Sequence, residues 1–144
     1  MSLNVQLLRD MLTQDTNAVK QLKELLLKER ELLEQRKLEG MQEIVGLKDH
    51  LLGNLAFTAK QREQVLRNAG LPTDLAGWNT FLSRDALTLA LIPEWQTLTN
   101  EFIECQTANE INGKMINRSR QTLSHLLNLL RGQVATPSLY TQKG

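Results

Sequence analysis

The chain has 144 residues, a net charge of +1, one cysteine, three prolines and 4% aromatic residues. Lysine and arginine alternate with acidic residues instead of forming a patch, which argues against a nucleic-acid partner, and the scarcity of aromatic residues and proline argues against an all-β fold. With a single cysteine, no start resembling a signal sequence and no run of about 18 apolar residues, we expect a soluble, cytoplasmic protein without an internal disulfide.

The first predicted helix begins near Ser2 or Asn4, either of which could cap it, and its pattern loses phase near Arg36. One face carries an apolar row, which Asp15 and Glu29 interrupt, and the opposite face is charged and suited to water. We therefore expect a helix that packs through one side. The row consists of Val5, Leu12, Val19, Leu26 and Leu33.

The segment RKLEG at residues 36–40 predicts the turn of a helical hairpin, although a continuous helix with a phase slip is an alternative. A second helix then follows. Gly70, Leu71 and Pro72 predict its end as a Schellman motif, in which Leu71 reaches back to Leu66 and Pro72 prevents continuation. Its apolar row consists of Leu38, Val45, Leu52, Ala59 and Leu66.

Thr73 or Asp74 can cap a short helical insert that runs from about Asp74 to Ile92. A long helix is then predicted from Pro93 to Arg131, and at about 1.5 Å per residue it would reach about 57 Å. Apolar and small residues recur along it with a heptad period, which is typical of a helix that packs against other helices. One row is Trp95, Phe102, Asn109, Ile116, Leu123 and Leu130, and the other is Leu98, Cys105, Asn112, Ser119 and Leu126.

The character of this long helix changes along its length. Its first part carries Trp95, Leu98 and Phe102, through which we expect the helix to pack securely. Asparagine and serine then occupy positions in both rows, either as buried residues that fix the register of packing or as part of an exposed stretch. We expect weaker packing from Ile116 onward, where the leucine-rich end begins.

These elements predict an all-α fold: a long antiparallel helical hairpin, a short helical insert and a long C-terminal helix. Residues 1–132 are expected to form a single domain, and residues 133–144 a flexible tail that contains Leu139 and Tyr140.

Nothing in the sequence points to catalysis, a metal or a cofactor. His50 and His125 lie on different predicted helices, and neither has a carboxylate or histidine three or four residues further on to make a metal pair. Cys105 falls on the apolar seam, where a cysteine behaves as a small hydrophobic residue. The glycines form no phosphate-binding loop. We therefore expect a protein that is not an enzyme and whose function is to pack against another protein.

The segment NEINGKMINRSRQTLSHLLNLLRG, residues 109–132, resembles the C-terminal helix of flagellar export chaperones of the FlgN type. In that family an Asn, an Asn-Gly pair, an apolar residue and a leucine-rich end leading into a Gly recur in this order. Here they fall on Asn109, Asn112 with Gly113, Ile116, Leu123 to Leu130, and Gly132. The hairpin segment KERELLEQRKLEGMQEIVGLKDHLL and the helix end QREQVLRNAGL are similar to the family too, so the resemblance covers nearly the whole chain.

The resemblance implies a chaperone that holds hook–filament junction (hook-associated) proteins in the cytoplasm, prevents their premature assembly and delivers them to the export gate of the flagellar type III apparatus. We expect the bound protein to contact the leucine end through Ile116, Leu123, Leu126, Leu127 and Leu130. Tyr140 is the expected contact with the gate, although Thr141 stands where the family's tail usually has a Gly. The alternative is a structural coiled-coil adaptor that dimerises through its helical seams.

Overall fold

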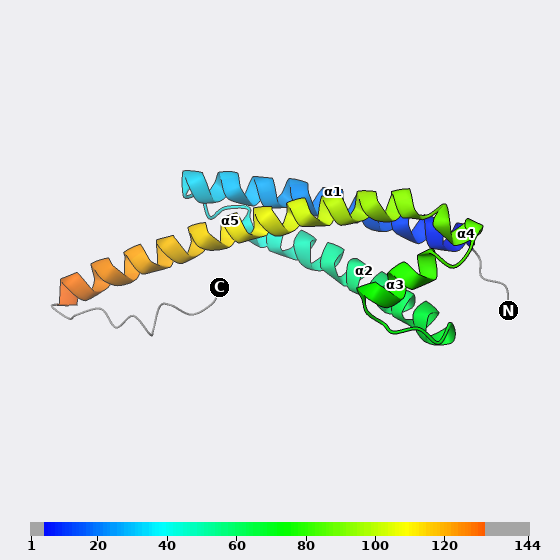
Figure 1. The fold of residues 1–144 in the computed structure, drawn as a ribbon. Coiled ribbons are helices and arrows are strands. Elements are labelled where there is room, and N and C mark those ends of the chain that lie inside the picture. The colour runs from blue at the N-terminus through cyan, green and yellow to red at the C-terminus, as the bar shows by residue number, and fades with distance from the viewer. Residues whose placement is uncertain (1–4, 132–144) are drawn as a thin grey trace.

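A computed structural model describes residues 5–131, with the side chains of residues 118–131 left out of the description. Within this range every regular element is a helix, which confirms the all-α prediction (Figure 1). The helices are α1 (Val5–Gln35), α2 (Met41–Asn68), α3 (Leu75–Leu82), α4 (Ala86–Leu89) and α5 (Ile92–Arg131).

Helix α1 is the central element, because it packs against both α2 and α5. The thiol of Cys105 bonds to the carbonyl of Val19, and the Asn112 amide bonds to the carbonyl of Leu26; both pairs are separated by 86 residues. A constant separation means that α1 and α5 run parallel, whereas α2 returns antiparallel to α1 (Figure 1). The hairpin and the long last helix are therefore confirmed.

The turn between α1 and α2 is set by two residues with left-handed backbone conformations. Arg36 has φ 55° and Gly40 has φ 86°. The N–H of Lys37 donates to the carbonyl of Leu32 over 2.9 Å, which ends α1 in a Schellman motif with Arg36 in the position that glycine usually takes. The predicted turn at residues 36–40 is thus confirmed, and a continuous helix is excluded.

The end of α2 also agrees with its prediction. Gly70 has φ 71°, and the N–H of Leu71 donates to the carbonyl of Leu66 over 2.9 Å. The N–H of Gly70 donates to the carbonyl of Arg67 over 3.0 Å, completing the two bonds of a Schellman motif.

The insert consists of two short helices, each capped by an aspartate. The carboxylate of Asp74 accepts from the N–H of Gly77 over 2.8 Å, and that of Asp85 accepts from the N–H of Thr88 over 3.0 Å. Gly77 is required here, because a Cβ atom at this position would lie 1.9 Å from the carbonyl oxygen of Pro72. The buried ring of Trp78 then stacks on Phe81 with centroids 5.4 Å apart.

The apolar row predicted for α1 forms the core, since Leu12, Val19 and Leu26 are each at most 2% exposed. Helix α2 behaves differently. Its predicted row stays largely outside, with Val45 48% and Leu52 45% exposed, and the helix instead buries the neighbouring row. That neighbouring row is Ile44, Leu51 and Thr58, and Leu66 at the end of the helix is the member of the predicted row that is buried.

Helix α5 also buries only one of its two predicted rows. Leu98, Cys105 and Asn112 are buried against α1. Trp95 is partly buried, whereas Phe102 is 43% exposed and Asn109 is exposed. The prediction of secure packing through Phe102 is therefore wrong. The reason is that α2 slopes away from α5 on this side and does not cover Phe102 (Figure 1), whereas Trp95 of the same row contacts Trp78 of α3.

The far end of α5 runs past the rest of the bundle. With the constant separation of 86 residues, the end of α1 at Gln35 lies level with Gln121, yet α5 continues to Arg131. Figure 1 shows this last part of α5, in orange, extending beyond the end of α1. The backbone from Leu123 to Leu130 therefore lies on a part of α5 that α1 no longer accompanies, whereas Ile116 lies before this point.

Candidate functional site

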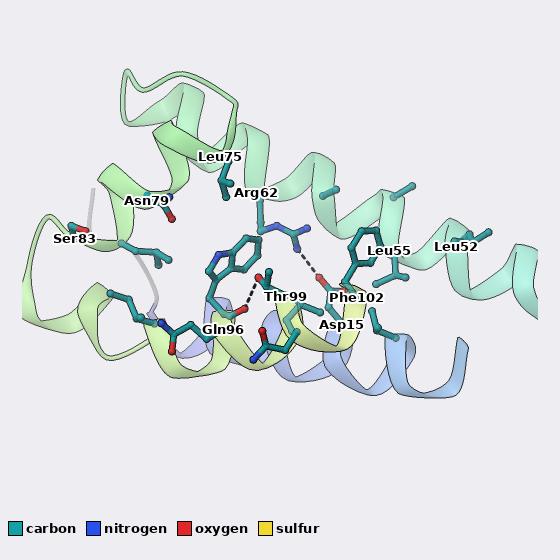
Figure 2. Close-up of a pocket in the computed structure, with 18 residues that line it drawn as sticks. Asp15, Leu52, Leu55, Arg62, Leu75, Asn79, Ser83, Gln96, Thr99 and Phe102 are labelled. Carbon is teal, nitrogen blue, oxygen red and sulfur yellow. Dashed lines mark hydrogen bonds and ion pairs between the residues drawn. The ribbon is translucent and has the colours of Figure 1, made fainter. Parts of the chain in front are cut away.

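A groove of about 920 Å³ lies between α2, α3 and α5, with α1 as its floor (Figure 2). It exists because α2 and α5 both pack on α1 but diverge from each other, while α3 fills the gap at one end only. The groove is larger than two other hollows on the described surface, which have volumes of about 640 and 230 Å³.

The two long walls differ in chemistry. The α2 wall is apolar and consists of Leu52, Leu55, Ala56 and Ala59. The α5 wall combines the rings of Trp95 and Phe102 with uncharged polar side chains, and Figure 2 shows Phe102 directed toward Leu55 across the groove. The polar members of this wall are Gln96, Thr99 and Asn100.

Asp15 and Arg62 are the two charged residues among those that line the groove, and they bind each other. Their oxygen and nitrogen lie 2.6 Å apart, and the side chain of Asp15 is 4% exposed. The hydroxyl of Thr58 donates to the other carboxylate oxygen over 2.7 Å, and the Arg62 guanidinium lies 5.6 Å from the Trp95 ring centroid. The pair joins α1 to α2, and leaves no unpaired charge at the floor (Figure 2).

A second polar cluster lies where α1, α2 and α5 meet, and Asn112 is its centre. Its amide nitrogen donates to the Leu26 carbonyl over 2.7 Å and to the Glu29 carboxylate over 2.9 Å. Its oxygen accepts from Arg30 over 3.2 Å, and Lys48 of α2 pairs with Glu29 over 3.0 Å. A shift of α5 by one turn would break these bonds, so Asn112 fixes the register, one of the two roles expected for it.

The other residues singled out from the sequence do not gather at one site. Asn109 is exposed, while Gly113 and Ile116 are half-buried. A Cβ atom at Gly113 would meet nothing within 4 Å, so close packing does not explain the glycine. The side chains of Leu123, Leu126, Leu127 and Leu130 lie outside the described part of the structure, as do Tyr140 and the predicted boundary between domain and tail. The predicted contacts at these positions stay predictions.

Sequence reasoning missed the groove, although the signal was present. The row of Leu52 and Ala59 on α2 and the row of Trp95 and Phe102 on α5 are both apolar in the sequence, but the prediction of secure packing through Trp95 and Phe102 leaves no space for a groove. A heptad row indicates that a face seeks a partner and does not say whether that partner belongs to the same chain.

The structure describes two of the side chains that were considered above for possible chemistry, Cys105 and His50. Cys105 is 3% exposed, and burial raises the pKa of its thiol, which makes the nucleophilic thiolate rarer. His50 lies on the surface of α2, as expected. Across residues 5–117, no group of three His, Cys, Asp or Glu side chains is placed to hold a metal ion.

The whole chain, residues 1–144, matches the family model described as FlgN protein. It is also similar to a crystal structure from Pseudomonas aeruginosa, provisionally assigned as a flagella synthesis protein FlgN. The two share 30% sequence identity with a TM-score of 0.70, and the match covers 90% of this chain and 99% of the other. Curated proteins give no significant match.

In the described range, none of the helices is both long and apolar enough to cross a membrane.

The family model covers every residue, and the fold agrees with a solved structure over nearly all of that chain. The protein belongs to the FlgN family.

Proposed function

We propose that this protein is a flagellar export chaperone that acts in the cytoplasm, binds hook–filament junction proteins before assembly and delivers them to the export gate. Membership of the FlgN family and likeness to a protein assigned to flagella synthesis support a role in flagellar assembly. The observation that carries the finer proposal is the extension of α5 beyond α1, with a leucine-rich sequence on the extended part.

A helix that extends beyond the other helices of its bundle keeps its internal backbone hydrogen bonds. It has fewer neighbouring helices to cover its apolar side chains. Such a segment can take up a partner's amphipathic or disordered terminal segment, which orders as it binds. The cost of that ordering lowers the net affinity, which keeps release possible. No catalytic group or bound nucleotide is needed for this activity.

The test is the affinity of purified hook–filament junction proteins for the wild type and for a Leu123→Ser/Leu126→Ser variant. Burying a leucine contributes about 1.5 kcal/mol and each 1.4 kcal/mol is tenfold, so we expect binding to weaken about 100-fold. Far-UV helicity should stay nearly unchanged, because the substituted positions lie past the end of α1.

The matched control is Leu87→Ser/Leu89→Ser, which changes two leucines that are 67% and 45% exposed at the opposite end of the molecule. This variant should bind as the wild type does. A wild type that binds no junction protein, and sediments as a stable dimer instead, would contradict the proposal and favour a coiled-coil scaffold.

Tyr140 is proposed as the contact with the export gate, because a tyrosine offers a flat apolar ring with a hydroxyl at its tip. We expect Tyr140→Ala to leave stability and junction-protein binding intact while weakening the binding of the chaperone–partner complex to the cytoplasmic domain of the gate. Unchanged affinity for the gate would remove this role from Tyr140.

A further inference from the structure

We propose that the groove between α2, α3 and α5 is a second docking site, which takes an amphipathic helix of the same partner protein as a fourth helix of the bundle. This inference rests on the proposed function, because it needs a protein partner. It differs from the leucine end of α5 in position and in the conformation that it requires of the partner.

The spacing of apolar residues on both walls fits a helix. Leu52 and Ala59 of α2 are seven residues apart, and so are Trp95 and Phe102 of α5. Two helical walls with heptad rows turned toward the same space are half of a four-helix arrangement, in which a further helix lies along both. Leu52 is 45% and Phe102 is 43% exposed, so contact area is still available on each wall.

The electrostatics of the groove define the face of the helix that would enter. On α5, Glu94 and Glu101 form ion pairs with Arg9 and Lys23 of α1, and none of these residues lines the groove. The lining carboxylate and guanidinium are already paired with each other at the floor. A charge on the entering face would therefore lose its water without gaining a partner, which is costly. The groove is complementary to an uncharged face, and the helix can carry its charges on the side left in water.

The same features disfavour other kinds of ligand. Small-molecule sites combine an apolar pocket with a few polar groups that converge on the ligand. Here the two charged groups of the lining, Asp15 and Arg62, bond to each other, and the Thr58 hydroxyl donates to the same carboxylate. A nucleic acid would require unpaired cationic side chains along the groove, and Arg62 is the one cation that lines it among the described residues.

The first experiment compares two pairs of substitutions that match in residue type, at four positions that are all substantially exposed. Leu52→Glu/Phe102→Glu places a charge on each wall of the groove. The control, Leu47→Glu/Phe57→Glu, changes a leucine that is 46% and a phenylalanine that is 64% exposed outside the groove. All four positions are substantially exposed, so both variants should fold, which circular dichroism checks.

We expect the groove variant to bind a hook–filament junction protein about 100-fold more weakly than the wild type, and the control to stay within about twofold, since two apolar contacts are lost in one case and none in the other. Unchanged affinity of the groove variant, with weakened binding by the variant at the leucine end, overturns the groove site and leaves the proposed function standing. A wild type that binds no junction protein overturns both.

The second experiment identifies what occupies the groove. A photoreactive group is attached to an Asn100→Cys variant, in which the native Cys105 is buried and protected from labelling. With the junction protein bound, crosslinks should map to one helical face of that protein, at spacings of three and four residues. Crosslinks to residues 118–144 of the same chain, or to a second copy, would show a different occupant and overturn the inference.

Discussion

The two sides of α5 carry similar apolar rows and have opposite surroundings. Toward α1, Leu98, Cys105 and Asn112 are at most 6% exposed, and polar bonds fix their register. Toward α2, Phe102 is 43% exposed and faces a groove of about 920 Å³. One helix therefore takes part in a closed interface and an open one at the same level of the bundle.

The closed side of α5 holds the helix in place, and the open side leaves apolar surface uncovered. The closed side holds the helices in fixed positions, because the buried thiol of Cys105 and the buried amide of Asn112 each have a defined partner on α1. The open side keeps apolar surface available, which a monomeric protein exposes when that surface serves an interaction. A stable scaffold beside an open apolar groove is the arrangement that a binding protein needs.

The largest expected effect tests whether the two rows of α5 contribute differently to stability, and it comes from truncating one residue of each row. We expect Leu98→Ala to lower the free energy of unfolding by about 3 kcal/mol, because it opens a cavity in the α1–α5 interface. Phe102→Ala should cost only about 1 kcal/mol despite the larger side chain, since much of the ring is already in water. Urea unfolding followed by circular dichroism measures both. Equal losses would mean that the groove is closed in solution.

Asn109 and Asn112, which lie three residues apart on α5, differ in the same way as the two rows. Asn112→Ala leaves the buried carboxylate of Glu29 without one of its donors, and we expect a loss of about 2 kcal/mol in the free energy of unfolding. Asn109→Ala lies three residues away on an exposed position and should change stability by less than about 0.5 kcal/mol. Similar losses for both would argue against a role of Asn112 in fixing the register.

The smallest effect concerns Lys23, which bonds to Glu101 and Glu104 on the closed side over 2.9 and 3.3 Å. The hydrogen bond to Glu101 raises the pKa of Lys23 above 10.5. A raised pKa means that the stabilisation is fully present below the unfolded-state value and is lost as the pH rises through the folded-state value. Lys23→Met should therefore be slightly less stable than the wild type at neutral pH, and the difference should vanish at strongly alkaline pH. A difference that persists there would assign it to packing.

Local features of the fold were predictable because they depend on short stretches of chain. Gly70, Leu71 and Pro72 allow few alternatives to a helix end, and the structure has the Schellman bonds expected from them. The row from Val5 to Leu33 on α1 was likewise identified as the packing face, since α1 has a neighbour on that side along its whole length.

The sequence by itself therefore determined the helices, their ends and the faces that avoid water, because periodicity, capping and turn chemistry act over a few residues. Only the tertiary structure decided which apolar face has a partner. Phe102 and Leu98 belong to equivalent heptad rows, and their different exposure depends on the angle at which α2 leaves α1. That angle results from packing among α1, α2 and the insert, and from buried bonds such as those of Asp15 and Asn112, which join residues far apart in the chain.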